Sequence, residues 1–196
     1  WVRDTFFFDL VEQEKAGGPN AFAAMTDYLP ESSEGLICLP YLAGERMPIN
    51  DPNAKGVLFG LTLNHDRGHI YRAALEGAAC SLVQNVKLME SVGLPVDRIT
   101  AVGGGTKNAA WMQIICDMAG MPLTIPEPFQ CSSYGDAMLA ALGVGALESF
   151  SALRAALPQG RILQPDRKNH EFYQEHYPIF RDLYLENRDR MHRMQK

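Results

Sequence analysis

The chain has 196 residues, of which 46% are hydrophobic and 21% charged, and its formal net charge is −5. This composition predicts one globular domain with its own core. No apolar run approaches the roughly 20 residues that cross a bilayer, and the acidic balance argues against nucleic acid or an anionic membrane as a partner.

The four cysteines, at positions 38, 80, 116 and 131, are far apart and form no CxxC pair. We therefore expect reduced, mostly buried thiols in a cytoplasmic protein, and neither a disulfide framework nor a metal site. The first 15 residues carry four acidic side chains and no small-residue cleavage site, which argues against a signal peptide. Because the chain begins with Trp1, we expect it to be part of a longer protein.

In chain order, apolar periodicity and helix breakers predict helices over 1–15 and 20–29, a strand over 36–42, a loop over 43–56 and an extended segment over 57–63. They then predict a long helix over 66–91, a strand over 98–102, a helix over 107–119, a strand over 122–126 and a helix over 135–147. A polar connection leads to a charged helix over 168–194. Since strand and helix alternate through 98–147, the sequence predicts an α/β fold with a partly parallel sheet.

The most informative segment is AVGGGTKNAAW at 101–111, where a short strand ends in Gly103, Gly104 and Gly105 and a helix follows. Such a turn brings the backbone close to a phosphate or nucleotide, at a helix end that favours anions. The run is neither a P-loop nor a complete dinucleotide fingerprint. Asn108 carries an amide that suits a ribose hydroxyl or an adenine edge. A tight turn with Asn108 as a helix cap explains the pattern equally well, so both interpretations stay open.

Two further charged groups have a structural and a functional interpretation. Glu45 and Arg46 follow a predicted strand end, where they would belong to a site or, more simply, form an internal ion pair that holds the loop. His65 and His69 have the spacing of a metal pair on one helix face, but without a third ligand nearby we expect them to cap the helix that starts at Asp66.

The start of the small-residue helix reads SSYGD at 132–136, and its spacing predicts a capping box with Ser133 as the N-cap and Asp136 at the third position. A loop-to-helix start here would also suit a ligand near the glycine turn. No Gly-x-Ser-x-Gly segment is present, so a serine-hydrolase triad is not supported.

Taken together, the motifs resemble the C-terminal domain of the FGGY family of carbohydrate kinases, most closely its xylulose-kinase-like members. The resemblance rests on WVRD at 1–4, the block from GLICLPYLAGERMP to RAALEGAA at 35–79, AVGGGTKNAAWMQIICDMAG at 101–120 and GDAMLAALGVG at 135–145. These segments stand in the family's order and cover most of residues 35–147. An ordered set of this kind is far more specific than the glycine turn alone.

The resemblance implies an RNase H-like, actin-like ATPase domain whose mixed sheet is flanked by helices and is incomplete at its N-terminus, with 168–196 as a C-terminal helix. It implies a kinase that uses ATP and Mg²⁺ to phosphorylate a sugar or polyol hydroxyl, and a chain that supplies the ATP/ADP-binding half. By the resemblance, Gly104, Gly105 and Asn108 line the nucleotide site and Gly103 supplies the turn. Secondary candidates are Gln113, Glu45, Arg46, Gly135 and Asp136. Gln113, together with Trp111, would mainly serve packing and orientation. At Asp136 the family usually has an alanine.

The resemblance also places the catalytic aspartate, the phosphate turn and the sugar-binding domain before Trp1, so no catalytic residue is assigned here. We accordingly expect the isolated chain to be inactive and to bind nucleotide weakly. An alternative is a non-catalytic actin-like module for assembly or regulation, and a weaker one is another actin-like ATPase or an acetate-type kinase. The sugar stays open because the family contacts it from the other domain, and an exposed strand would allow a homodimer.

Overall fold

The computed structural model describes residues 1–127, 132–156 and 160–194. The N-terminal part holds the helices α1 (Val2–Phe6), α2 (Phe8–Lys15) and α3 (Ala21–Ala24), the 3₁₀ turn η1 (Met25–Tyr28), and the strands β1 (Ile37–Leu39) and β2 (Val57–Phe59). The rest holds α4 (Arg67–Ser91), β3 (Ile99–Thr100), the 3₁₀ turn η2 (Gly104–Lys107), α5 (Ala109–Ala119), β4 (Leu123–Pro126), α6 (Ser132–Gly143), α7 (Phe150–Ala156), β5 (Gly160–Leu163) and α8 (Arg167–Arg193).

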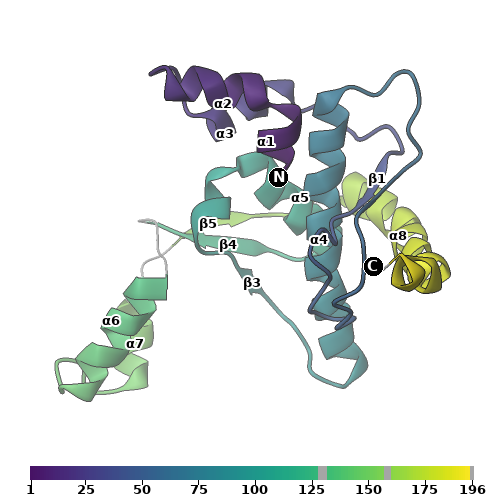
Figure 1. Cartoon of the computed structure of the whole chain (residues 1–196). Coiled ribbons are helices and arrows are strands. Elements are labelled where there is room, and N and C mark those ends of the chain that lie inside the picture. The colour runs from purple at the N-terminus through teal and green to yellow at the C-terminus, as the bar shows by residue number, and fades with distance from the viewer. Residues whose placement is uncertain (128–131, 157–159, 195–196) are drawn as a thin grey trace.

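Two small sheets flank the central helix α4. Strands β1 and β2 pair antiparallel, with Cys38 opposite Leu58, while the second sheet has the order β3-β4-β5. In that sheet β3 and β4 are parallel and β4 and β5 antiparallel, so the sheet is mixed. Figure 1 shows α4 upright in the centre, with the β3-β4-β5 sheet on one side and α8 on the other. The predicted α/β class with a partly parallel sheet is confirmed.

The main core forms where α4, α5 and α8 meet the strands. It contains buried side chains from each of these elements, among them Leu39, Ala79, Cys116, Leu123 and Phe180. A smaller cluster, centred on Phe7, joins α1, α2 and α3 to Tyr71 of α4. This second cluster fixes the N-terminal helices beside the start of α4, and it thereby positions one wall of the cavity described below.

Most predicted elements are found, but several boundaries differ. The predicted helix over 1–15 is two helices, because the backbone at Phe7 leaves the helical region with φ −128° and ψ 33°. The prediction of a plain polar connection before the last helix was wrong, because this segment contains helix α7 and the third strand of the sheet, β5. Strand β5 was not predicted because Gly160 has no side chain and Arg161 and Ile162 are exposed, so the strand lacks a buried alternating pattern.

The cap predicted for the small-residue helix was also wrong. Helix α6 begins at Ser132, so Ser133, Gly135 and Asp136 all lie inside the helix rather than ahead of it. By contrast, the long helix begins where predicted, with Asp66 as its N-cap, and Gly120 ends α5 in the left-handed conformation with φ 68°. Cys38, Cys80 and Cys116 are free and buried as expected, while Cys131 lies outside the described residues.

Candidate functional site

The glycine turn follows β3 directly. Gly103 has φ +88°, a conformation that L side chains rarely adopt, and its carbonyl accepts the Thr106 hydroxyl at 2.8 Å and the Thr106 amide at 3.1 Å. These bonds close the turn η2, and the next residue, Asn108, is the N-cap of α5. The backbone here is therefore a fixed turn between a sheet strand and a helix.

The three glycines are needed for different reasons. Gly103 is required by its positive φ, and a Cβ on Gly105 would lie 2.7 Å from Cζ3 of the Trp111 ring, which packs against it. A Cβ on Gly104 would meet no atom within 4 Å, and its φ is not positive. Neither conformation nor packing within the described residues requires glycine at 104, and the space beside it belongs to a cavity.

This cavity has a volume of about 610 Å³, within the range of small-molecule and cofactor sites. One wall is the glycine turn with the start of α5, a second is α4, and the third is α3 with η1. The lining residues are Asn20, Phe22, Ala23, Thr26, Tyr71, Leu75, Gly104, Gly105, Lys107, Asn108 and Trp111. The wall from α3 and η1 was missed by sequence reasoning, because residues 20–29 carry no motif and lie about 80 residues from the glycines.

Asn108 combines the two roles that the sequence left open. Its Oδ1 accepts the Trp111 amide at 3.0 Å, which is a helix cap, and its Nδ2 donates to the Tyr71 hydroxyl at 2.7 Å. Burial raises the pKa of Tyr71, so this hydroxyl stays protonated at neutral pH. An amide nitrogen carries two hydrogens, and Asn108 lines the cavity, so its second N–H is available to a ligand there.

The structure brings Gly104, Gly105 and Asn108 together in the cavity lining, but it does not bring the other candidates there. Gly103 sits just ahead of the lining residues. Gln113 points to the opposite side of α5, where its Nε2 donates to Asp117 Oδ1 at 2.7 Å and to the Gln164 carbonyl at 3.0 Å.

Gly135 and Asp136 lie on α6, which packs on α7 and stands apart from the body of the chain in Figure 1. Both residues are exposed. In this arrangement the start of α6 is not a wall of the cavity beside the glycine turn.

The buried carboxylate Asp117 was not singled out from the sequence. It is 3% exposed and accepts hydrogen bonds from three groups, the Gln113 amide at 2.7 Å, the Asp166 backbone N–H at 2.8 Å and the Asn169 amide at 2.9 Å. These bonds fasten the start of α8 to α5. Asp117 stands on the apolar face of a periodic helix, and that unusual placement was the available signal.

The loop predicted over 43–56 is held by a different carboxylate from the one expected. Among the described residues neither Glu45 nor Arg46 has an ion-pair partner; Glu45 Oε1 accepts the Arg46 backbone N–H at 2.8 Å. The fixed point is Asp51, whose Oδ2 accepts the Tyr184 hydroxyl and His192 Nε2, each at 2.8 Å. The internal ion pair predicted for Glu45 or Arg46 is therefore not found, and the loop is fastened to α8 instead.

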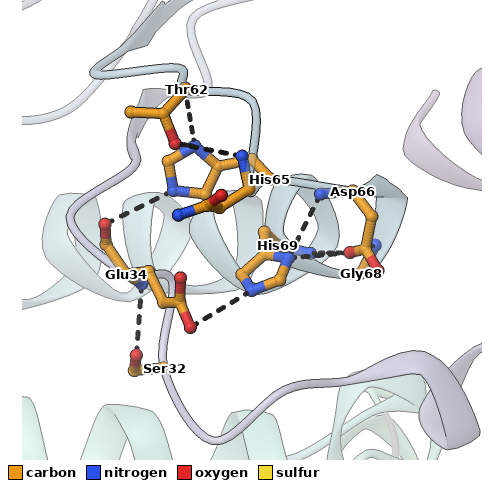
Figure 2. A network of polar contacts seen from close by, with 8 residues as sticks. Ser32, Glu34, Thr62, His65, Asp66, Gly68 and His69 are labelled. Atoms are coloured by element: carbon orange, nitrogen blue, oxygen red, sulfur yellow. Dashed lines mark hydrogen bonds and ion pairs between the residues drawn. The ribbon is translucent and has the colours of Figure 1, made fainter.

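The two histidines at the start of α4 cap and brace the chain, as Figure 2 shows. Asp66 and His69 form a capping box, in which Asp66 Oδ1 accepts the His69 backbone N–H at 3.1 Å and His69 Nδ1 accepts the Asp66 backbone N–H at 3.2 Å. The contacts with His69 lower the pKa of Asp66. His65 lies ahead of the helix, not on its face, and its Nδ1 accepts the Thr62 backbone N–H at 2.9 Å. The capping interpretation is confirmed for His69, whereas His65 is not a cap and holds the loop ahead of the helix. Within the described ranges, no group of three or more His, Cys, Asp or Glu side chains could hold a metal ion.

Comparison with known proteins now adds to this geometry. Residues 1–144 match the model of the C-terminal domain of the FGGY family of carbohydrate kinases. A xylulose kinase from Staphylococcus epidermidis is 30% identical over 189 residues, which are 96% of this chain and 37% of that protein. A gluconokinase from Bacillus subtilis is 32% identical over 187 residues, which are 93% of this chain and 36% of that protein. The chain thus spans little more than a third of the length of these relatives.

Solved structures of related kinases are also similar to this chain. The xylulose kinase from Rhodospirillum rubrum matches with a TM-score of 0.78 and 30% identity, over 98% of this chain and 38% of that one. Glycerol kinase from Plasmodium falciparum, solved with ADP, matches with a TM-score of 0.70 and 26% identity, over 83% of this chain and 34% of that one. The expected actin-like ATPase fold is confirmed. No described helix is both long and apolar enough to span a membrane. The chain belongs to the FGGY family of carbohydrate kinases, and its residues 1–144 correspond to the C-terminal domain of that family.

Proposed function

We propose that residues 1–196 form the nucleotide-binding half of an ATP-dependent kinase that phosphorylates a hydroxyl of a sugar or polyol of the xylulose type. The cavity beside the glycine turn would hold ATP or ADP, with Gly104, Gly105 and Asn108 against it. The relatives named as xylulose kinase and gluconokinase support this reaction class. A cytoplasmic location follows from the need for ATP and agrees with the free, buried thiols.

The observation that carries the proposal is the open space at Gly104. A glycine outside the left-handed region and without close neighbours costs stability through backbone entropy, and no contact with the described residues compensates for that cost. It gains a purpose when a ligand approaches the backbone there, beside a cavity of about 610 Å³. The second N–H of Asn108 and the exposed Lys107, both in the lining, complement the oxygen-rich ribose and phosphates of a nucleotide.

In this proposal the remaining chemistry belongs to the rest of the parent enzyme. We assign no catalytic base among the residues of this chain, and the described residues offer no metal cluster, so Mg²⁺ would be held by the nucleotide phosphates and by groups elsewhere. This chain contributes binding and orientation of the nucleotide. The sugar would enter from the other domain, and closure of the two domains would exclude water.

The test is calorimetric titration of the purified chain with Mg-ADP and Mg-ATP. We expect Gly104→Ala to weaken binding by at least about tenfold, equivalent to about 1.4 kcal/mol, because its methyl group occupies the ligand's space. Gly143→Ala is the matched control, since its added methyl also meets no atom within 4 Å but lies on α6, away from the cavity. Asn108→Ser keeps a cap acceptor and removes the amide donor, so it should weaken binding while the chain stays folded.

Activity is measured separately. We expect the isolated chain to show no turnover with any sugar, and the full-length protein to phosphorylate a sugar or polyol. Turnover by the isolated chain would contradict the division of roles proposed here. If neither the folded chain nor the full-length protein binds nucleotide, the nucleotide site is wrong and a structural, non-catalytic module is the better description.

A further inference from the structure

We propose that α3 and η1 form a base-selective wall, on which Phe22 stacks the base and Thr26 accepts a hydrogen bond from the amino group of adenine. This inference rests on the proposed function, namely that the cavity holds a nucleotide. It assigns a role to a segment that no sequence motif marks. It also predicts which nucleotides the site prefers.

The layout of the cavity separates a backbone wall from a side-chain wall. Gly104 and Gly105 expose bare backbone on one side, which suits the phosphates and ribose, whereas Phe22, Ala23 and Thr26 present side chains on another. A base is the planar, partly apolar part of a nucleotide, so it fits against an open aromatic ring. Of the three aromatic side chains in the lining, Tyr71 is 6% exposed and Trp111 packs against Gly105, whereas Phe22 is open. The wall from η2 would therefore contact the phosphates and ribose, and the wall from α3 would contact the base.

Phe22 has the features of a stacking residue. It lines the cavity and is 55% exposed. This exposure is unfavourable for a large apolar side chain, whose burial would stabilise the fold. The guanidinium of Arg3 lies over its ring, with Cζ 4.7 Å from the ring centroid, and Arg3 is held in turn by Asp4 at 2.7 Å. Arg3 thus restricts the motion of the Phe22 ring before any ligand binds. This lowers the entropy cost of stacking a base on the part of the ring that Arg3 does not cover.

Thr26 can only accept a further hydrogen bond. Its hydroxyl donates its single hydrogen to the Ala23 carbonyl at 2.6 Å, so the oxygen offers lone pairs and no proton to a ligand. The exocyclic amino group of adenine is a donor, whereas the corresponding group of hypoxanthine or guanine is a carbonyl acceptor. A carbonyl facing Thr26 would set two acceptors against each other, so the wall favours adenine.

The experiment compares Mg-ADP with Mg-IDP, which differ at that group, by calorimetric titration of the chain and of the full-length protein. We expect the wild type to bind ADP about three- to tenfold more tightly than IDP. Thr26→Val, which keeps the shape and removes the acceptor, should abolish this ratio without abolishing binding. Thr26→Ser, which keeps the hydroxyl, should preserve the ratio.

Phe22→Ala should weaken both nucleotides alike, by roughly 5- to 100-fold, because stacking tolerates any base. Phe22→Tyr, which keeps the aromatic face, should restore most of the affinity, and circular dichroism checks that each variant is folded. An ADP-to-IDP ratio unchanged by Thr26→Val, or affinity unchanged by Phe22→Ala while Gly104→Ala lowers it, would overturn the base wall alone. If the wild type binds neither nucleotide in either form, the proposed function fails together with it.

Discussion

Helices α5 and α6 have similar lengths and both are rich in apolar residues, yet they have opposite environments. Six residues of α5 are buried, including Ile114, Ile115 and Cys116, because α4, α8 and the sheet surround the helix. No residue of α6 is buried, and among the described elements its main contact is with the short helix α7, away from the body of the chain (Figure 1). Both helices are in places where the family resemblance implied a nucleotide contact, but only the start of α5 lines the cavity.

The difference teaches that apolar composition does not determine burial. A helix stabilises a fold through the surface that its neighbours cover, so the body of the chain should depend strongly on α5 and hardly on α6. Substitutions in the two regions test this difference directly. The expected effects decrease from the core of α5, through the junction of the loop at 43–56 with α8, to the exposed face of α6.

The largest effect is expected for Ile114→Ala. Ile114 is 2% exposed in the main core, so the substitution should lower the free energy of unfolding by about 2–5 kcal/mol, through lost burial and the cavity left behind. Urea denaturation followed by circular dichroism measures the change. A loss below about 1 kcal/mol would mean that α5 is not a main contributor to the core.

An intermediate effect is expected at Asp51. Burial opposes its charge, but hydrogen bonds from His192, Tyr184 and the Asn53 backbone outweigh burial and lower the pKa of Asp51 to about 2. A carboxyl group with a lowered pKa stabilises the fold above its unfolded pKa of about 4, and this contribution is lost as the pH falls towards 2. The shift corresponds to roughly 2 kcal/mol, on a side chain that is 8% exposed.

The measurement is the free energy of unfolding as a function of pH, for the wild type and for Asp51→Asn. We expect the wild type to lose stability between pH 4 and pH 2 and the variant to lose less over the same interval, because asparagine does not titrate there. Exposed Asp136, replaced by asparagine, serves as the control. Parallel curves for wild type and Asp51→Asn would show that Asp51 does not fasten the loop to α8.

The smallest effect is expected for Leu139→Ala on α6. Leu139 is 58% exposed, so its truncation removes little buried surface and should change the free energy of unfolding by less than about 0.5 kcal/mol. The same urea titration as for Ile114→Ala gives a direct comparison of the two helices. A loss as large as that of Ile114→Ala would show that α6 contributes a core of its own.

The strongly periodic and well-punctuated elements could be predicted from the sequence. Asp66 at the start of α4 and Gly120 at the end of α5 are local signals, because a cap and a left-handed residue act within one helical turn. Strand β5 and the break at Phe7 could not be predicted, since each depends on neighbours distant in the chain. The fastening residues Asp51 and Asp117 were missed for the same reason, because their partners are on α8 and the segment before it.

Local sequence signals were sufficient to predict the α/β class, the glycine turn with Asn108 at the start of a helix, and an ordered set of motifs specific enough to indicate the family. These properties depend on local backbone preferences and on residue order, which a single chain displays directly. That α3 and η1 face the glycine turn across a cavity, while α6 does not, follows from the three-dimensional packing alone. Such proximity arises from packing around Phe7 and α4, and side chains that meet through space leave no regular spacing in the sequence.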